Sequence, residues 1–215
     1  MGVVRLVMLG PPGAGKGTQA ARFAREHHVP KISTGDILRE AVQEGTPLGR
    51  AARAVMDAGR LVGDDIVIGI VGERLERDDA AGGFVLDGFP RTIPQATALD
   101  GMVDGKAPLV VVDIEVPEEA LVERLSGRRV CGACGWTAPP GLAACARCGG
   151  ALVQRRDDNP DVVRERLRVY ARDTRPLVEF YRLRPTFRSV DGDQAQDAVA
   201  ADIASAVASV VGGGR

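Results

Sequence analysis

The chain has 215 residues, 45% of them hydrophobic, which suits one main domain with a substantial core and room for a smaller insertion. Lysines and arginines number 28 against 29 acidic residues, and the resulting net charge of −1 argues against a generally basic nucleic-acid binder. No apolar run is long enough to span a membrane and the N-terminus lacks the pattern of a signal peptide, so we expect a cytoplasmic protein with neither membrane nor nucleic-acid partners.

An apolar, β-branched run from Val3 to Leu9 predicts a buried strand near the start of the chain. A glycine-rich turn begins at Gly10, and a helical pattern follows from about Gly15 to Glu26. Strand, glycine loop and helix in this order are the context of a phosphate-binding loop, in which backbone N–H groups and the helix dipole hold the anion. Lys16 adds a charge that can reach the β- and γ-phosphates. The sequence therefore predicts a nucleotide-binding loop.

This loop departs from the generic pattern G-x-x-x-x-G-K-[ST] at one position. Gly17 stands where Ser or Thr is expected, and Thr18 follows one place later. A glycine-rich turn after a strand can also be no more than a tight connection to a helix. A lysine at position 16 has no packing reason to be there, however, so nucleotide binding is the better interpretation.

Farther along, apolar strands alternate with helical patterns. Four more strands are predicted at Val29–Ile32, Phe84–Asp87, Leu109–Val116 and Thr186–Val190. Helices are predicted from Ser33 or Thr34, from Thr46–Pro47, from Asp64, from Pro117 to about Ser126, and from Pro160 through Phe180, with an Ala/Val-rich helix after the last strand. Five strands that alternate with helices predict a parallel α/β sheet.

The segment from about Gly127 to Asn159 breaks this alternation and predicts an inserted subdomain, because it is rich in Gly, Pro and Cys and has no long apolar period. It contains all four cysteines of the chain, as two C-x2-C pairs: Cys131 with Cys134, and Cys145 with Cys148. Two such pairs supply four thiolates at tetrahedral reach. The pattern favours a closed, structural zinc site over a redox dithiol or metal-free knuckles.

Arginines make up all but three of the basic residues, and roughly half of them lie between Arg124 and Arg184. A zinc ribbon with such arginines can bind nucleic acid, but nucleic-acid modules usually interleave several stacking aromatics with basic residues. Trp136 is the only aromatic residue of the insertion. Because Arg binds phosphate in a planar, bidentate way, a phosphate-rich substrate is the better interpretation.

Five segments carry a family resemblance: GPPGAGKGTQ (Gly10–Gln19), STGDILR (Ser33–Arg39), LDGFPRTIPQ (Leu86–Gln95), GRRV (Gly127–Val130) and RRDDN (Arg155–Asn159). Together they resemble adenylate kinase in its long form with a zinc-type lid, over nearly the full chain. The family's own loop also reads GKGT, so Gly17 is expected there. The resemblance implies reversible transfer of a phosphoryl group from ATP to AMP, giving two ADP, by a monomer that uses Mg²⁺ and a structural Zn²⁺.

The fold that this resemblance implies is the three-layer α/β fold of P-loop NTPases, with a five-stranded parallel sheet. A core domain would comprise residues 1–32, 63–126 and 162–215. An arm that binds the nucleoside monophosphate (NMP) would comprise residues 33–62, and a zinc-ribbon-like lid residues 127–161.

The resemblance also implies the site residues. The ATP phosphates would be held by Gly13, Ala14, Gly15, Lys16, Gly17 and Thr18, with Thr18 near Mg²⁺ and Asp87 on magnesium-bound water. AMP would be bound by Thr34, Arg39, Arg60, Leu61, Val62, Gly88, Arg91 and Gln95, with Arg39 and Arg91 on its phosphate and the Gln95 amide on the adenine edge. Arg124, Arg128, Arg155 and Arg166 match arginines that close over both phosphate chains: Arg124 and Arg128 on the ATP side, Arg155 and Arg166 on the AMP side.

Phosphoryl transfer depends on positioning and charge neutralisation, so no essential general base is expected. The catalytic set would be Lys16, Asp87, Arg91, Arg128, Arg155 and Arg166. The alternative for the arginines is surface salt bridging with Asp157, Asp158 or Glu165.

The hairpin between the cysteine pairs, Gly135–Ala144, is shorter than the family's usual one. The resemblance implies that Trp136 and Thr137 contact the adenine of ATP, but because the hairpin is short, an equal alternative is that Trp136 only shields the zinc site. Thr34 and Gln95 favour AMP over UMP, CMP or dTMP as the acceptor, because a site built around hydrogen bonds rejects analogues that leave its groups unpaired. A rival function, a P-loop ATPase or switch whose ribbon contacts nucleic acid or protein, leaves Arg39, Arg91 and Gln95 unexplained.

Overall fold

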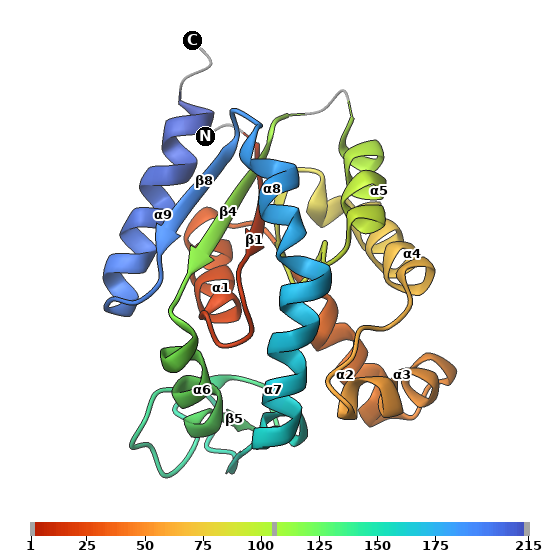
Figure 1. The fold of residues 1–215 in the computed structure, drawn as a ribbon, viewed down its shortest axis with the longest axis vertical. Coiled ribbons are helices and arrows are strands. Elements are labelled where there is room, and N and C mark those ends of the chain that lie inside the picture. Colours follow the sequence, from red (N-terminus) through yellow and green to blue (C-terminus); the bar gives the residue numbers. More distant parts are fainter. Residues whose placement is uncertain (1–2, 105–106, 213–215) are drawn as a thin grey trace.

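The computed structural model describes residues 3–104 and 107–212, and a five-stranded parallel sheet lies at its centre (Figure 1). The strands stand in the order β2-β3-β1-β4-β8. Their bounds are Val4–Leu9 for β1, Lys31–Ser33 for β2, Gly83–Asp87 for β3, Leu109–Glu115 for β4 and Phe187–Asp191 for β8. The order changes direction at β1, and open α/β sheets bind ligands at the carboxyl ends of the strands at such a point.

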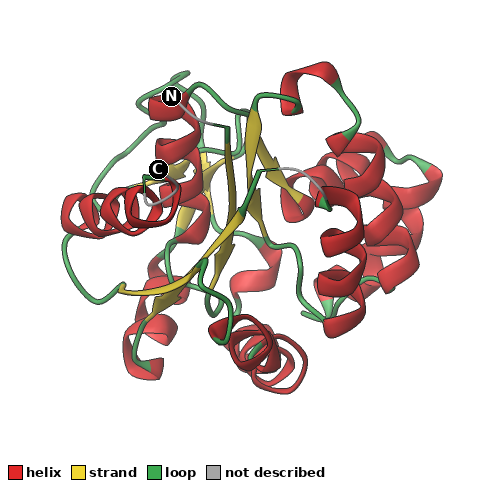
Figure 2. Cartoon of the chain, turned by 90° about the horizontal axis from the view of Figure 1, so that it is seen from above, coloured by secondary structure: helices red, strands yellow, loops and turns green. Residues whose placement is uncertain are grey.

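Helices cover both faces of the sheet, which gives the three layers that the sequence predicts (Figure 2). Their bounds are Lys16–His27 for α1, Thr34–Glu44 for α2, Pro47–Asp57 for α3, Asp64–Leu75 for α4, Ile93–Val103 for α5, Glu118–Gly127 for α6, Pro160–Val169 for α7, Pro176–Arg182 for α8 and Gln196–Val211 for α9. Short turns of 3₁₀ helix lie at η1 (Asp78–Ala80) and η2 (Arg156–Asp158). Within the described ranges, no helix combines the length and apolarity needed to cross a membrane.

The alternation of side chains along β1 divides the core into two layers. Leu6 and Met8 point to the face covered by α1 and α9, whereas Val7 and Leu9 point to the face covered by α4, α5 and α8. All six residues of β1 are buried, which explains why its sequence is an almost continuous apolar run. This central strand holds the glycine loop that follows it in a fixed place.

The five strands of the sheet confirm the prediction, with ends shifted by at most two residues. The helix α5 was not expected. The predicted continuous α-helix from Pro160 through Phe180 is wrong in its middle, where Tyr170–Thr174 (η3) form a π-helical segment. Pro176 has no N–H to continue the α-helical pattern, and the N–H of Arg175 donates instead to the carbonyl of Tyr170, five residues back, at 2.8 Å.

The insertion between α6 and α7 forms a small antiparallel sheet in the order β6-β5-β7. Its strands are Arg129–Cys131 (β5), Thr137–Ala138 (β6) and Leu152–Val153 (β7). In Figure 1 this segment lies at the same end of the molecule as the helical pair α2 and α3. Two appendages of the chain therefore stand near the carboxyl end of the central sheet.

Candidate active site

The glycine loop after β1 takes a backbone course that larger residues would not follow. Gly10, Gly13 and Gly15 have φ angles of 133°, 89° and 90°. A Cβ at Gly10 would lie 2.7 Å from the carbonyl oxygen of Ile114, in β4. The loop leads directly into the N-terminus of α1, which begins at Lys16. Loop and helix end together have the geometry of an anion site, and phosphate binding there stays a prediction.

Lys16 lies folded back over this loop. Its Nζ donates to the carbonyl oxygens of Gly10 at 2.7 Å and Pro11 at 2.8 Å. Burial lowers the pKa of Lys16 to about 8, with the charge of Asp87 opposing the shift and the charges of Arg91 and Arg166 adding to it. A negative phosphate beside the ammonium would restore its full charge.

Asp87, at the end of β3, lies against the first turn of α1. A Cβ at Gly17 would be 3.2 Å from Oδ2 of Asp87. Lys31 Nζ lies 3.6 Å from the same oxygen and bonds to Asp36 Oδ2 at 2.8 Å. The glycine at position 17, the departure from the generic loop pattern, therefore leaves room for this carboxylate. Carboxylate and hydroxyl oxygens are ligands that suit Mg²⁺, directly or through water, so Asp87 and Thr18 fit such an ion.

A cleft of about 1050 Å³, counting its part open to solvent, runs from the glycine loop to α2 and α5. Gly10, Pro12 and Lys16 line it at one end. The residues predicted for AMP that line it are Thr34, Arg39, Arg60, Leu61, Val62, Gly88, Arg91, Gln95 and Arg166. Segments far apart in the sequence thus meet in one cavity, although their roles toward AMP stay predictions.

The polar residues at the inner end of the cleft are fixed by hydrogen bonds. Gln95 is 1% exposed; its Oε1 accepts from the backbone N–H of Arg91 at 2.8 Å, and its Nε2 donates to Asp64 Oδ1 at 2.7 Å. The Thr34 hydroxyl donates to the carbonyl of Gly88 at 2.8 Å. Gln95 keeps one N–H and one lone pair for a ligand, and Thr34 keeps its acceptor positions.

Arg128 and Arg166 share one carboxylate. Asp158 is fully buried, and it accepts from Nε and NH2 of Arg128 and, at 2.9 Å, from NH1 of Arg166. Arg166 also reaches Asp157 Oδ2 at 3.1 Å. The salt-bridge alternative for these two arginines is therefore realised, but at a buried acid rather than a surface one. The shared carboxylate holds the root of the insertion (Arg128) against α7 (Arg166).

The other predicted arginines differ in their surroundings. Burial lowers the pKa of Arg155 to about 10, and within the described part of the chain its guanidinium makes no hydrogen bond or ion pair. Burial also lowers the pKa of Arg91 to about 10, helped by the charge of Arg166. Arg124 instead donates to the Gly192 carbonyl and to Asp193 Oδ1, both at 3.0 Å.

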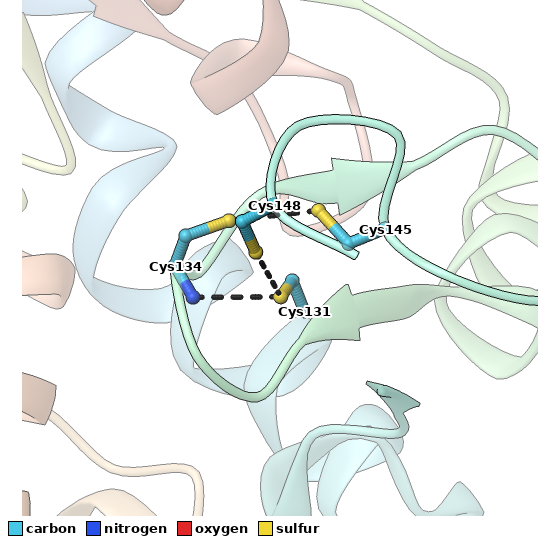
Figure 3. Close-up of side chains that lie close together, drawn as sticks. All are labelled: Cys131, Cys134, Cys145 and Cys148. Atoms are coloured by element: carbon cyan, nitrogen blue, oxygen red, sulfur yellow. Dashed lines mark hydrogen bonds between the residues drawn. The ribbon is translucent and has the colours of Figure 1, made fainter. Parts of the chain in front are cut away.

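The four cysteines form one cluster (Figure 3). Their sulfur atoms all lie within 4.8 Å of one another; Cys131 and Cys148 are 3.5 Å apart, and Cys134 and Cys145 are 3.6 Å apart. Tetrahedral zinc with bonds of about 2.3 Å would place the sulfur atoms about 3.8 Å apart, whereas a disulfide needs about 2.05 Å. The donor set and its spacing fit a closed zinc site.

The turns of the two C-x2-C pairs support this cluster. Gly135 and Gly149 follow the second cysteine of each pair and have φ angles of 70° and 73°, as their positions in the sequence suggest. The backbone N–H of Cys134 donates to Cys131 Sγ at 3.4 Å and lowers the pKa of that thiol. A lowered pKa favours the thiolate that a metal requires.

Comparison with known proteins agrees with this geometry. The model of the family described as "Adenylate kinase" matches residues 8–185. The chain belongs to the adenylate kinase family. It is 52% identical to the adenylate kinase of Moorella thermoacetica over 204 residues, which cover 91% of this chain and 94% of that protein.

Two further relatives show the same similarity over nearly complete chains. The adenylate kinase of Symbiobacterium thermophilum is 50% identical over 212 residues, covering 95% of this chain and 98% of that protein. The adenylate kinase of Archaeoglobus fulgidus is 50% identical over 197 residues, covering 88% and 91%. The resemblance of the sequence segments to the long form of the family thus agrees with the family match, the fold and the spacing of the four cysteines.

Of the residues that we predicted for ATP, Lys16 alone is among the described residues that line the cleft, whereas the other residues of the glycine loop, Arg128, Arg124, Trp136 and Thr137 are not. Arg124 pairs as above, and Thr137 lies in β6 opposite Val130. Trp136 is half-buried, with the guanidinium of Arg147 over its ring at 5.6 Å. This contact joins the turn of one cysteine pair to the other pair, so it agrees with shielding of the metal. A contact of these residues with ATP stays a prediction.

The sequence did not point to Lys31, Asp64 or the buried role of Asp158. Lys31 and Asp64 were interpreted only as a strand residue and a helix start. In the sequence, Asp158 lies shortly before the predicted helix start at Pro160 and close to Arg155 and Arg156, a position that is compatible with many solvent-exposed arrangements. Only the tertiary fold brings each of them to its partner.

Proposed function

We propose that this chain is an adenylate kinase that transfers a phosphoryl group reversibly from ATP to AMP and yields two molecules of ADP. The observation that carries this proposal is the convergence of Lys16, Arg91 and Arg166 beside the glycine loop, in the cleft that continues to Gln95. Arg91 and Arg166 each depress the pKa of Lys16, so like charges are held together. Such an arrangement is stabilised by a polyanion, and two nucleotides end to end supply one.

Residues at different places in the cleft would bind different phosphate groups. Lys16 and the backbone N–H groups from Gly13 to Thr18 would hold the ATP phosphates, while Arg39 and Arg91 would hold the phosphate of AMP. Arg128, Arg155 and Arg166 would neutralise charge on the transferred group. The reaction needs little covalent help from the protein, because positioning and charge neutralisation lower its barrier.

Mg²⁺ would be held by Asp87, through water, and by Thr18, and when bound it neutralises phosphate charge. Zn²⁺ would be held by Cys131, Cys134, Cys145 and Cys148. The small sheet β6-β5-β7 has few buried apolar residues, and a metal stabilises a segment of this size.

The proposal includes three units: the core of residues 1–32, 63–126 and 162–215, the NMP-binding arm of residues 33–62, and the lid of residues 127–161. Closure of arm and lid would exclude water, which would otherwise hydrolyse ATP. The charge of Arg39, from the arm, lowers the pKa of both Arg155 and Asp157, from the lid, so the two units lie close enough across this cleft for a bound anion to draw them together. We further propose a cytoplasmic monomer without membrane partners, and the net charge and the single aromatic residue of the insertion argue against a nucleic-acid partner.

A coupled assay of ADP formation from ATP with AMP, CMP, UMP or dTMP as acceptor tests the proposal. AMP is expected to be the preferred acceptor, and Arg91→Ala is expected to lower kcat/KM for AMP by at least about 100-fold, because a buried charge-assisted contact is lost. Arg74→Ala, which removes an arginine paired with Asp79 away from the cleft, serves as control. If AMP does not stimulate ADP formation, the proposed function fails.

A further inference from the structure

The side-chain amide of Gln95 is held at both ends by groups of opposite hydrogen-bonding character. The backbone N–H of Arg91 can only donate, and it meets Oε1 at 2.8 Å. The carboxylate of Asp64 can only accept, and it meets Nε2 at 2.7 Å. Turning the amide by 180° would place donor against donor and acceptor against acceptor. At 1% exposure water cannot relieve such a mismatch, so the amide has one orientation.

Asp64 is itself held in place. Its second oxygen, Oδ2, accepts from the Thr92 hydroxyl at 2.9 Å, and Thr92 caps the N-terminus of α5, the helix that carries Gln95. Asp64 is the first residue of α4, where the helix dipole favours a negative charge. The carboxylate therefore joins the starts of two helices and keeps its direction at the inner end of the cleft.

This fixed orientation has a consequence for the base of the acceptor nucleotide. Gln95 has one N–H and one oxygen lone pair left. Adenine presents the complementary edge, an acceptor at N1 beside a donor amino group at position 6. Hypoxanthine and guanine present the reverse, a donor N1–H beside an acceptor oxygen, and they would need the turned amide.

We propose that Asp64 is a specificity-determining positioning residue, which makes the acceptor site select a 6-amino over a 6-oxo purine by fixing the direction of the Gln95 amide. This inference rests on the proposed function, because it concerns the base of the same acceptor. Asp64 acts through Gln95 and touches neither the phosphates nor the transferred group.

Initial rates of ATP consumption with AMP, IMP and GMP, measured for the wild type, Asp64→Ala and Asp65→Ala, test the inference. Asp65 is the matched control, since it carries the same charge in the same first turn of α4 and its side chain is exposed. For Asp64→Ala we expect the ratio of kcat/KM between AMP and IMP to fall about tenfold, chiefly through a higher KM for AMP, because one charge-assisted hydrogen bond is lost. The KM for ATP should stay within about twofold, since the glycine loop is untouched. Asp65→Ala should keep the wild-type ratio.

The outcomes separate the two proposals. If the wild type does not use AMP, the proposed function is contradicted. If the wild type uses AMP and Asp64→Ala leaves the ratio of kcat/KM between AMP and IMP unchanged, only the role of Asp64 is overturned. An equal loss with AMP and IMP also overturns it, because that result indicates general damage to the site. If Asp64→Ala does not fold, Asp64→Asn is measured instead; its amide has nearly the same size but also donates, so the ratio should fall about threefold. An unchanged ratio in that variant contradicts the inference.

Discussion

A Cβ at Gly17 would lie 3.2 Å from Oδ2 of Asp87, closer than an ordinary van der Waals contact. The glycine of the loop and the acid at the end of β3 thus depend on each other. The serine or threonine of the generic loop pattern would require this carboxylate to shift by a few tenths of an ångström, away from the place proposed for magnesium-bound water. Sequence comparison with the generic pattern marks position 17 as a departure, and the structure gives its steric reason.

Gly17→Ser is therefore expected to weaken Mg²⁺-dependent turnover without unfolding the protein. We expect kcat to fall by about tenfold and the Mg²⁺ concentration for half-maximal rate to rise, because Asp87 loses its position. Steady-state rates over a magnesium titration provide the measurement. Gly69→Ser in α4 is the control, since no described atom lies within 4 Å of a Cβ there. Full activity of Gly17→Ser at low Mg²⁺ would show that the contact does not matter.

Asp158 offers a test of stability. It is fully buried and pairs with both Arg128 and Arg166, so Asp158→Asn leaves two guanidinium groups without their shared negative charge. The free energy of unfolding is expected to fall by about 3 kcal/mol, the usual cost of removing one member of a buried ion pair. Urea denaturation at neutral pH measures it. Asp161→Asn, which removes an exposed partner of Arg164, should change stability by less than about 0.5 kcal/mol. Equal effects of the two substitutions would contradict a special role for the buried pair.

The features predictable from the sequence are those that depend on local pattern. The apolar run of β1, the glycine loop and the two C-x2-C pairs each carry their signal within a few residues, and the structure has all of them where they were expected. The helix α5 carries a weaker signal: Ala96 and Leu99 lie on its buried face, but the polar Gln95 is buried beside them while the apolar Ile93 is exposed.

Contacts between distant segments escaped prediction for a different reason. Asp64 and Gln95 are 31 positions apart, and Arg128 and Asp158 are 30 apart. A side chain's partner across such a distance depends on how the sheet and helices are placed, which no periodicity reports. The sequence offered Asp158 only as one of three possible surface partners of the arginines, and it gave no sign that Asp64 would hold Gln95.

Asp113, at the carboxyl end of β4, should make stability depend on pH. It is 4% exposed, its Oδ1 has no hydrogen-bond partner in the described structure, and burial raises its pKa from 3.8 to about 6, with Glu115 adding to the shift and Lys16 opposing it. The Asp113 carboxyl group thus binds a proton more tightly in the folded protein than in the unfolded chain. Its contribution to stability is favourable below about pH 4 and is lost as the pH rises through about 6.

Asp113→Asn isolates this contribution, because the amide cannot ionise. The variant is expected to be more stable than the wild type at about pH 8 by roughly 2–3 kcal/mol, and the difference should disappear near pH 4. Urea denaturation of both proteins across this range provides the measurement. The other acids of the chain titrate in both proteins and cancel in the comparison. A difference in stability that is the same at both ends of the range would exclude ionisation of Asp113 as its cause.

Removal of metal from the cysteine cluster is expected to affect the insertion before the rest of the protein. The insertion has the four clustered thiols and little apolar core, whereas the glycine loop is held by β1 and α1 in the centre of the fold. Zinc removed by a chelator should therefore lower the Tm by several degrees or more, since metal binding contributes directly to folding. Binding of ATP to the loop should persist, although turnover should fall as the lid arginines lose their positions.

Trp136 allows this change to be followed directly, because it is the only tryptophan of the chain and lies beside Arg147 of the second cysteine pair. Its fluorescence should shift toward that of an exposed indole on chelation and return when zinc is added back. Cys145→Ser, which removes one buried ligand, should reproduce the low Tm without chelator. Elemental analysis must accompany each sample. An unchanged Tm and fluorescence in protein shown to be metal-free would mean that the four cysteines hold the lid together by packing alone.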